Sequence, residues 1–248
     1  MPPFRIEPQE FDSGRLAPAV GTLVLERPIA PSPDDEARIV AQARTEGYDL
    51  ICLALPGPTR LRWFDYVGTL DEYAVDLARA LEALRGVPRR VEARPVGPDD
   101  WDGVKDLLSY SSATRFSNDL RLPREVVTEH KLDMLRTYAT RYPRYSLVAP
   151  SPGGLLGLQW SYHSMSDLVL YEIVVKRSVA AGFVGLALLA ENVARISQDV
   201  ASLDRVVSWI YEHNKRSITF FSGLGLRWTG RRQCFYHLWP RSVDEAVC

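Results

Sequence analysis

Apolar and polar residues alternate along two runs in the second half of the chain, residues 155–163 and 168–175. A period of two is typical of β-strands, because successive side chains point to opposite faces of a sheet. The four residues between the runs, 164–167, include two serines and an aspartate, and four is a common length for a hairpin loop. We therefore predict two antiparallel strands joined by this loop.

The loop sets a register for this hairpin. If His163 pairs with Leu168, the ladder places Gln159 opposite Glu172. Alternation then puts both residues on one face of the pair, together with Ser161 and His163. The predicted hairpin therefore gathers polar side chains on a single face.

Glu172 is the candidate for chemistry on this face, since it is a carboxylate inside the apolar run LVLYEIVV. Burial disfavours the charged form of a carboxylate and so makes it a stronger general base. A second interpretation stays open, in which Gln159, an arginine or the backbone satisfies Glu172 and the residue has no chemical role.

Other segments alternate in the same way or carry an apolar residue every three or four positions, the spacing of a helix with one buried face. Asp34 is expected to cap the first helix. Helices are predicted at residues 34–46, about 70–84, 101–108, 123–141 and 186–200, with a short one from Asn214. Strands are predicted at residues 22–26, 49–55, 91–95, 145–149 and 204–211, with a terminal strand around Tyr236.

This mixture of elements predicts an α/β protein. A polar break, RGVPRR, lies at residues 85–90, and it divides the chain into predicted domains at residues 1–88 and 89–248. A length of 248 residues with 46% hydrophobic residues is enough to build a sizeable core.

Charge and apolar content exclude several functions. A net charge of −1 gives no basic field that would hold nucleic acid or an anionic membrane. The longest apolar stretch is too short to cross a bilayer, and the first residues lack the apolar core of a signal peptide. We therefore expect a cytoplasmic protein with no membrane and no nucleic-acid partner.

The cysteines and histidines do not form a metal site in the sequence. Cys52, Cys234 and Cys248 are too few and too scattered for a disulfide framework or a zinc site, and no two histidines have ligand spacing. We expect no metal, and a buried free thiol at Cys52.

The segment after the hairpin is the most informative part of the chain. It runs strand, short loop, helix, strand, short helix and turn, with the loop at residues 176–185 and GLGL at residues 223–226. A loop between a strand and a helix N-terminus presents backbone N–H groups, which can bind phosphate or pyrophosphate.

This order resembles the acetyl-CoA-dependent N-acetyltransferase superfamily, the GNAT (GCN5-related N-acetyltransferase) fold. The resemblance implies a mixed, mainly antiparallel twisted sheet flanked by helices, and an acyl-CoA as substrate without a metal. It also implies that the strand before the loop splays and pairs with pantetheine, that the loop holds the pyrophosphate, and that Asn214 contacts the pantetheine arm. The residues that would bind the cofactor are Ile173, Val174, Val175, Ala181, Gly182, Phe183, Val184, Gly185, Leu186, Asn214 and Phe221.

The first half narrows this resemblance. FDSGRLAPAVGTLVLERP resembles the opening of bacterial TDP-4-amino-4,6-dideoxysugar (TDP-fucosamine-type) N-acetyltransferases, in which a truncated GNAT-like domain precedes a full one. Arg115, Phe116 and Asp119 match the S-RF-x-x-D-x-R segment of those enzymes. The resemblance implies a nucleotide-linked amino sugar, or a related small-molecule amine, as acceptor, and a homodimer is common among such proteins.

Three positions depart from the family pattern. The family loop reads Arg/Gln-x-x-Gly-x-Gly, whereas this chain has Ala180 and Phe183 in place of the leading polar residue and the first glycine. Phe221 stands where relatives commonly have a tyrosine that protonates the departing thiolate, and phenylalanine cannot donate a proton. Tyr211, Ser222 or Tyr236 could substitute, and no spacing selects one of them.

The leading interpretation is an N-acyltransferase in which Glu172 takes the amine proton, directly or through water. His163 is the second candidate for a base or an acceptor contact, although it could equally be a polar residue at the end of a hairpin. Two other functions stay open. The altered loop could accept the phosphopantetheine arm of an acyl carrier protein or serve a different reaction on a bound thioester or amine, or the protein could be a non-catalytic binding protein whose cleft is filled by Phe183 and Phe221.

Overall fold

The computed structural model of the chain describes residues 3–88, 91–111, 116–176 and 181–247. The chain forms two compact units. The first comprises Met1–Asp71, Ala113–His130 and Arg231–Cys248, and the second comprises Glu72–Ser112 and Lys131–Gly230. These units are discontinuous in sequence and do not divide at residue 88. The assignment of domains to residues 1–88 and 89–248 stays a prediction.

The first unit is built on strands that follow the order β1-β2-β3-β10-β4. The pairs β1–β2 and β3–β10 are antiparallel, whereas β2–β3 is parallel. The long strands β4 and β10 contribute residues to both units. The elements of this unit are β1 (Phe4–Pro8), β2 (Val20–Leu25), α1 (Pro33–Thr45), β3 (Leu50–Leu55), the start of β4 (Asp65–Asp76), the end of β10 (Arg227–Leu238) and η3 (Pro240–Val247).

Helix α1 covers this part of the sheet with the predicted apolar stripe. Ile39, Val40 and Ala43 are buried in one cluster with residues of β1, β2, β3 and β10. The helix begins earlier than predicted, because Ser32 rather than Asp34 is the N-cap. The Ser32 hydroxyl accepts a hydrogen bond from the backbone N–H of Asp35 at 3.2 Å, in a capping box.

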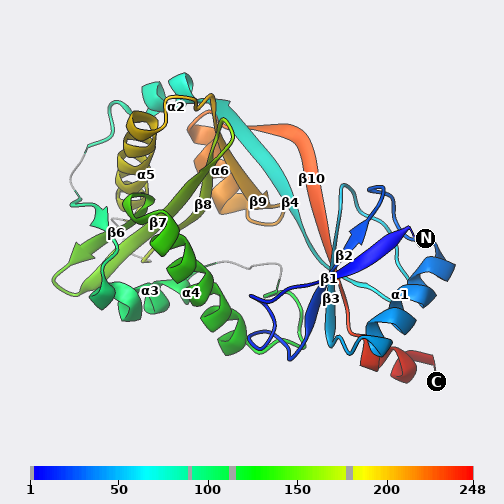
Figure 1. Cartoon of the computed structure of the whole chain (residues 1–248). Coiled ribbons are helices and arrows are strands. Elements are labelled where there is room, and N and C mark those ends of the chain that lie inside the picture. The colour runs from blue at the N-terminus through cyan, green and yellow to red at the C-terminus, as the bar shows by residue number, and fades with distance from the viewer. Residues whose placement is uncertain (1–2, 89–90, 112–115, 177–180, 248) are drawn as a thin grey trace. The chain divides into compact units, whose positions relative to one another are not determined.

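The second unit carries strands in the order β10-β4-β9-β8-β7-β6-β5. Helices α3 and α4 pack on one face of β6, β7 and β8, and helices α2, α5 and α6 pack on the face made by β8 and β9 (Figure 1). Its elements are α2 (Leu77–Leu84), β5 (Arg94–Pro95), η1 (Pro98–Asp100), α3 (Trp101–Leu108), α4 (Arg124–Arg141, from Lys131), η2 (Pro143–Tyr145), β6 (Ser146–Ser151), β7 (Gly154–Ser164), β8 (Asp167–Val175), α5 (Ala181–Asp199), β9 (Arg205–Tyr211) and α6 (Lys215–Gly223).

One predicted helix is mostly a strand. The sequence predicts a helix at about residues 70–84, but Asp65–Asp76 forms β4 and only Leu77–Leu84 is helical. The acidic residues Asp71 and Glu72 are buried within this strand and hide its alternation. Arg232 satisfies Asp71 with hydrogen bonds of 2.7 and 2.9 Å. A buried acid that obtains its partner from a distant strand gives no local signal.

Helix α5 also begins earlier than predicted, at Ala181 instead of residue 186. Val184 belongs to this extra turn, and together with Leu188 it is buried against Leu147 and Ala149 of β6. Ala181 to Gly185 are therefore helical, and their assignment to the loop is wrong.

The cysteines and the helices bear on two predictions, a buried thiol at Cys52 and the absence of a membrane-spanning segment. Cys52 is buried, as predicted, and so is Cys234; neither forms a disulfide. Throughout the described ranges, each helix is too short or too polar to cross a membrane.

Candidate active site

The hairpin of β7 and β8 keeps the predicted register near its loop and loses it further along. His163 pairs with Leu168, as predicted. The register then shifts at Trp160, so that Glu172 lies opposite Trp160. The predicted pairing of Glu172 with Gln159 is therefore wrong.

A β-bulge in β8 causes this shift. Trp160 pairs with Glu172 and Ser161 pairs with Leu170, which leaves Tyr171 as the extra residue. A bulge bends its strand and redirects side chains. Here Tyr171 and the next residue, Glu172, both contact helix α4: the Tyr171 hydroxyl lies 3.1 Å from the Sδ atom of Met134.

The bulge also moves Glu172 to the other face of the sheet. Trp160, its partner, is buried against α3 and α4. Ser161 shares the face of Leu170, which packs in the cluster that contains α5. The prediction that Glu172 shares a face with Gln159 and Ser161 is therefore wrong, because alternation holds only while the ladder has no extra residue.

Glu172 belongs to a cluster of three polar residues with Lys131 and Ser111, which we call the Glu172 cluster. The Lys131 ammonium lies 2.8 Å from the Oε2 atom of Glu172 and donates to the Ser111 hydroxyl at 2.6 Å. The Ser111 hydroxyl donates to the Oε1 atom of Glu172 at 3.0 Å. Both carboxylate oxygens are thus engaged, and the three groups form a closed ring of hydrogen bonds.

The Glu172 cluster is largely removed from water. The side chain of Glu172 is 15% exposed and that of Lys131 is 7% exposed. Removing one member of a buried ion pair leaves the other charge uncompensated, which typically costs about 3–5 kcal/mol. Each charge therefore needs the other, and the pair is neutral as a unit.

Lys131 and Ser111 were missed by the sequence reasoning. A signal for Lys131 does exist, because it lies midway between Val127 and Leu135 at helical spacing, and both of these are buried. A lysine on the apolar stripe of a helix requires a buried partner. Ser111 follows α3 in a polar segment and carries no comparable signal.

A set of partly buried tyrosines lies between α4 and the hairpin. The Tyr138 ring stacks on Tyr171 and Tyr162, with ring centroids 5.2 and 5.4 Å apart, and Tyr142 stacks on Tyr138 at 6.3 Å. Burial raises the pKa of Tyr138 and of Tyr162; the neighbouring Tyr142 raises both further, and Tyr138 also raises the pKa of Tyr162. These hydroxyls therefore stay protonated at neutral pH and remain hydrogen-bond donors.

His163 lies at the edge of this tyrosine set and apart from Glu172. Its ring meets Tyr142 edge-on, with centroids 5.9 Å apart. Its partner Leu168 precedes Glu172 by four residues along β8, roughly 12 Å of strand. The two predicted catalytic side chains are therefore not brought together.

Strands β8 and β9 separate directly before the bulge. Their parallel ladder runs from the pair of Asp167 with Arg205 to the pair of Leu170 with Ser208. Both strands continue, β8 to Val175 and β9 to Tyr211, but in the described ranges no ladder pair joins them beyond Leu170. Ile173, Val174 and Val175 therefore lie on the diverging part of β8.

The N-terminal turn of α5 follows this diverging segment. The first N–H groups of a helix have no partner within the helix and can bind an anion. Phe183 lies in this turn and is 67% exposed, so it does not fill a cleft. Ala181 and Gly182 are helical, and Ala180 lies outside the described residues.

Gly157 lets this helix approach the sheet. A Cβ atom on Gly157 would lie 3.0 Å from the Val184 side chain and 3.1 Å from the Val174 carbonyl oxygen. Both separations are tighter than ordinary contacts, so a larger residue would push α5 away from the end of β8.

The two remaining predicted cofactor residues have structural partners. The Asn214 side-chain oxygen accepts from the Ser217 N–H at 3.1 Å and caps helix α6. Phe221 is 3% exposed and packs in the core of the second unit. Tyr236 is one of the residues that could replace the tyrosine missing at Phe221. It lies in the first unit, where its hydroxyl accepts a hydrogen bond from the Thr59 N–H at 2.7 Å.

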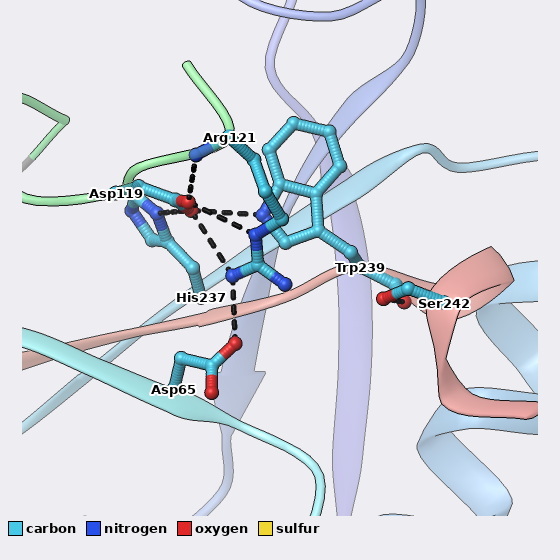
Figure 2. A network of polar contacts seen from close by, with 6 residues as sticks. All are labelled: Asp65, Asp119, Arg121, His237, Trp239 and Ser242. Atoms are coloured by element: carbon cyan, nitrogen blue, oxygen red, sulfur yellow. Dashed lines mark hydrogen bonds and ion pairs between the residues drawn. The ribbon is translucent and has the colours of Figure 1, made fainter. Parts of the chain in front are cut away.

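The first unit contains a further buried carboxylate, Asp119, from the segment that resembles the sugar N-acetyltransferases (Figure 2). Arg115 of that segment lies outside the described residues. His237 Nδ1 and Trp239 Nε1 each lie 2.8 Å from its Oδ2 atom, and Arg121 binds Oδ1 through its backbone N–H and its Nε. Burial alone would raise the pKa of Asp119, but these hydrogen bonds outweigh it and hold the pKa well below its usual range. Arg121 continues to Asp65 at 2.7 Å.

A second buried His–Asp pair lies in the same unit. His130 Nε2 is 2.7 Å from Asp12. The ring of Phe116 contacts His130 edge-on at 5.2 Å and His237 at 5.5 Å. His130 is itself buried, on helix α4.

Sequence comparison assigns no relative. No protein-family model matches the chain, and no curated protein sequence matches it. Structure comparison, by contrast, finds similar folds over most of the chain. A conserved protein of unknown function from Staphylococcus epidermidis has a TM-score of 0.60 at 10% identity, covering 89% of this chain and 84% of that one.

Two further solved structures carry a family name. A tandem GNAT protein from the clavulanic acid biosynthesis pathway has a TM-score of 0.56 at 16% identity, over 89% of this chain and 75% of its own. A GCN5-related N-acetyltransferase from Sphaerobacter thermophilus has a TM-score of 0.57 at 10% identity, over 96% of this chain and 76% of its own. The chain has a GNAT fold.

The predicted fold class is therefore confirmed: a mixed α/β protein with an open sheet flanked by helices, as in GNAT structures. The bulge and Glu172 lie on β8, directly before the part of that strand that diverges from β9 and leads to α5. In the described portion of the chain, no group of three or more His, Cys, Asp or Glu residues could hold a metal ion.

Proposed function

We propose that the protein is an N-acyltransferase that moves an acyl group, acetyl in the first instance, from a CoA thioester to a primary amine. One observation carries this proposal: β8 leaves β9 at the residue before the bulge that presents Glu172. A backbone edge that could align the thioester and a carboxylate that could accept a proton therefore lie within a few residues of each other.

The diverging strand and the helix that follows it would bind the donor. The backbone of Ile173, Val174 and Val175 would pair with the pantetheine arm, as the resemblance to GNAT proteins implies. The first N–H groups of α5, at Ala181, Gly182 and Phe183, would bind the pyrophosphate. Asn214 would contact the arm from the start of α6.

Glu172 would act as the general base for the amine. Proton removal by a positioned side chain typically accelerates a reaction by about 10²–10⁴-fold. Phe221 lies in the core and provides no acid, but a thiolate is a fair leaving group, since the usual thiol pKa is about 8.5. His163, next to Tyr142, would contact the acceptor instead of the thioester.

A nucleotide-linked amino sugar is the acceptor that we propose. The support is the resemblance of the first half of the chain to TDP-amino-sugar N-acetyltransferases, including the segment with Phe116 and Asp119. The truncated GNAT-like domain that we predict at residues 1–88 belongs to the same proposal.

A second donor is favoured by Phe183. This large apolar side chain is exposed in the first turn of α5, where the GNAT pattern has glycine. It could pack against an acyl carrier protein whose phosphopantetheine arm lacks the adenosine pyrophosphate. The acyl transfer at Glu172 would be the same with either donor.

Calorimetry with CoA, 4′-phosphopantetheine and an acylated carrier protein separates these donors. If CoA binds more tightly than 4′-phosphopantetheine, the result supports a CoA thioester as the donor. If acyl transfer occurs from the carrier protein alone, the result supports the carrier protein as the donor. Thiol release from acetyl-CoA in the presence of TDP-linked and free amino sugars then tests the acceptor. No binding of CoA at millimolar concentration, together with no transfer from a carrier protein, would refute both versions.

A further inference from the structure

A pocket lies at the carboxyl end of strand β2 in the first unit. Its volume is about 360 Å³, and small-molecule sites in proteins commonly measure about 300–1,000 Å³. Strands β2 and β3 are parallel and are joined through helix α1. In sheets that are connected in this way, ligands bind outside the carboxyl ends of the strands. The pocket therefore has the position of a ligand site, and its lining includes Phe4, Leu25, Glu26, Arg27, Ile29 and Asp35.

One wall of the pocket is apolar. Phe4 is buried in the cluster that joins α1 to the sheet, and Leu25 packs against that cluster. Ile29 lines the same pocket and is 65% exposed. Pro28 and Pro31 flank Ile29, and proline fixes the backbone φ angle, so binding would require little ordering of this segment. An apolar ligand group would cover Ile29 and gain contact with a preformed wall.

Two exposed side chains of opposite charge line the pocket. In the described parts of the chain, the side chains of Glu26 and Arg27 form no hydrogen bond or ion pair. Asp35, in contrast, accepts from the Ser32 hydroxyl at 2.7 Å and pairs with Arg38. A ligand that carries one positive and one negative group would complement Glu26 and Arg27 together.

A phosphate group is disfavoured beside this pocket. The first turn of α1 carries Asp34, Asp35 and Glu36, and the N–H of Asp35 already donates to the N-cap Ser32. Like charges repel a phosphate that approaches this turn. The first turn of α5 has no acidic residue. The pocket is therefore unsuited to CoA or to a nucleotide.

We propose that this pocket binds a small zwitterion with an apolar body, which is the chemistry of an apolar α-amino acid. The ammonium would pair with Glu26 and the carboxylate with Arg27, whose guanidinium can donate two parallel hydrogen bonds to a carboxylate. The apolar side chain would lie against Ile29. Exposed ion pairs contribute little, so burial of the apolar group would supply most of the affinity. The proposal does not depend on acyl transfer at Glu172.

Calorimetry on the full chain with L-leucine and three analogues tests the chemistry of the ligand. L-leucinamide lacks the carboxylate and N-acetyl-L-leucine lacks the ammonium, and each should bind about 5-fold more weakly than L-leucine. Glycine keeps both charges but lacks the apolar group, and it should bind at least about 10-fold more weakly. No binding of L-leucine at millimolar concentration, or equal binding of all four compounds, would overturn the proposal.

Substitutions assign each group of the ligand to its residue. Glu26→Gln should weaken binding of L-leucine about 5-fold and leave binding of N-acetyl-L-leucine unchanged, because that analogue has no ammonium. Arg27→Gln should weaken L-leucine similarly and leave L-leucinamide unchanged. Ile29→Ser should weaken all three compounds about 10-fold. Leu120→Ser is the matched control, since Leu120 is also exposed in the first unit but does not line the pocket, and its affinities should be those of the unaltered protein.

An amino acid is also a primary amine, so its binding must be distinguished from binding as an acyl acceptor. Glu172→Gln should leave the affinity for L-leucine unchanged, because Glu172 belongs to the second unit. Affinity that is lost in Glu172→Gln but kept in Glu26→Gln and Ile29→Ser would place the amino acid at the acceptor site and overturn the pocket. Failure of CoA to bind the same samples would refute the proposed function alone.

Discussion

Asp119 and Glu172 are both buried carboxylates, and they differ in how they are held. Asp119 is 1% exposed and receives hydrogen bonds from His237, Trp239 and Arg121. Glu172 is 15% exposed and has a lysine and a serine hydroxyl as its partners. A hydroxyl can reverse its direction of donation, whereas the guanidinium and indole donors of Asp119 cannot.

This contrast distinguishes a carboxylate held by fixed donors from one that has a rotatable hydroxyl among its partners. Every donor around Asp119 stabilises its charged form, and the resulting pKa lies well below the usual range. Protonation of Asp119 would break the whole network. Glu172 is paired with a single buried ammonium and one hydroxyl that can rotate to donate or to accept.

The largest expected effect is loss of stability in Asp119→Ala. The change leaves Arg121, His237 and Trp239 without their common acceptor, which should lower the free energy of unfolding by about 3–5 kcal/mol. Urea denaturation followed by circular dichroism measures it. Asp65→Ala removes the exposed partner of Arg121 and is the matched control, with a change below about 1 kcal/mol. If Asp119→Ala were as stable as Asp65→Ala, Asp119 would not stabilise the fold, and the contrast between Asp119 and Glu172 would not hold.

Glu172→Gln should lose activity, and it should also lose about 3–5 kcal/mol of stability because it leaves the buried Lys131 ammonium without its counter-charge. We expect kcat to fall by about 10²–10⁴-fold because the amide cannot accept the amine proton. The KM for acetyl-CoA should change little. Steady-state thiol release and thermal unfolding of the same sample give both quantities. A fully active Glu172→Gln protein would place the base elsewhere.

A double variant sharpens the comparison. Lys131→Met alone leaves Glu172 buried without its counter-charge and should cost about 3–5 kcal/mol of stability. Adding Glu172→Gln removes that charge and should recover most of the loss, while activity stays absent. Chemical denaturation of the three proteins measures the coupling. Additive losses would mean that the two side chains do not interact in solution.

The smallest effect is a pH dependence of stability. The pKa of Asp119 is lower in the folded protein than in the unfolded chain, where it is about 3.9. The contribution of Asp119 to the free energy of unfolding is therefore present above about pH 3.9 and is lost as the pH falls towards the pKa of the folded state. The stability difference between the unaltered protein and Asp119→Asn should therefore narrow below about pH 4. Urea midpoints between pH 6 and pH 3 test this, and a constant difference would contradict it.

The sequence predicts much of the frame and little of the site. The hairpin is present, and its register near the loop is correct because alternation is unbroken from Leu168 to Leu170. The bulge at Tyr171 could not be foreseen, since LVLYEIVV contains no glycine or other local signal for an extra residue. Because of that residue, the predicted neighbours of Glu172 were wrong.

The other errors have the same physical origin, a partner far away in the sequence. Strand β4 resembles a helix because the buried Asp71 breaks its apolar pattern, and its partner Arg232 lies on β10. Lys131 reaches Glu172 of β8 from helix α4. Tertiary contacts overrode the local pattern at each of these positions, whereas α1, with the apolar stripe of Ile39, Val40 and Ala43, was predicted correctly in type.

The bulge has a consequence for how such proteins can diverge. Inserting or deleting one residue at Tyr171 would move each side chain between that point and the end of β8 to the opposite face of the sheet. A carboxylate could thus pass from the α5 face to the α4 face while its codon stays the same. Along this strand, the length of the chain determines which face a side chain meets as much as the identity of its residues does.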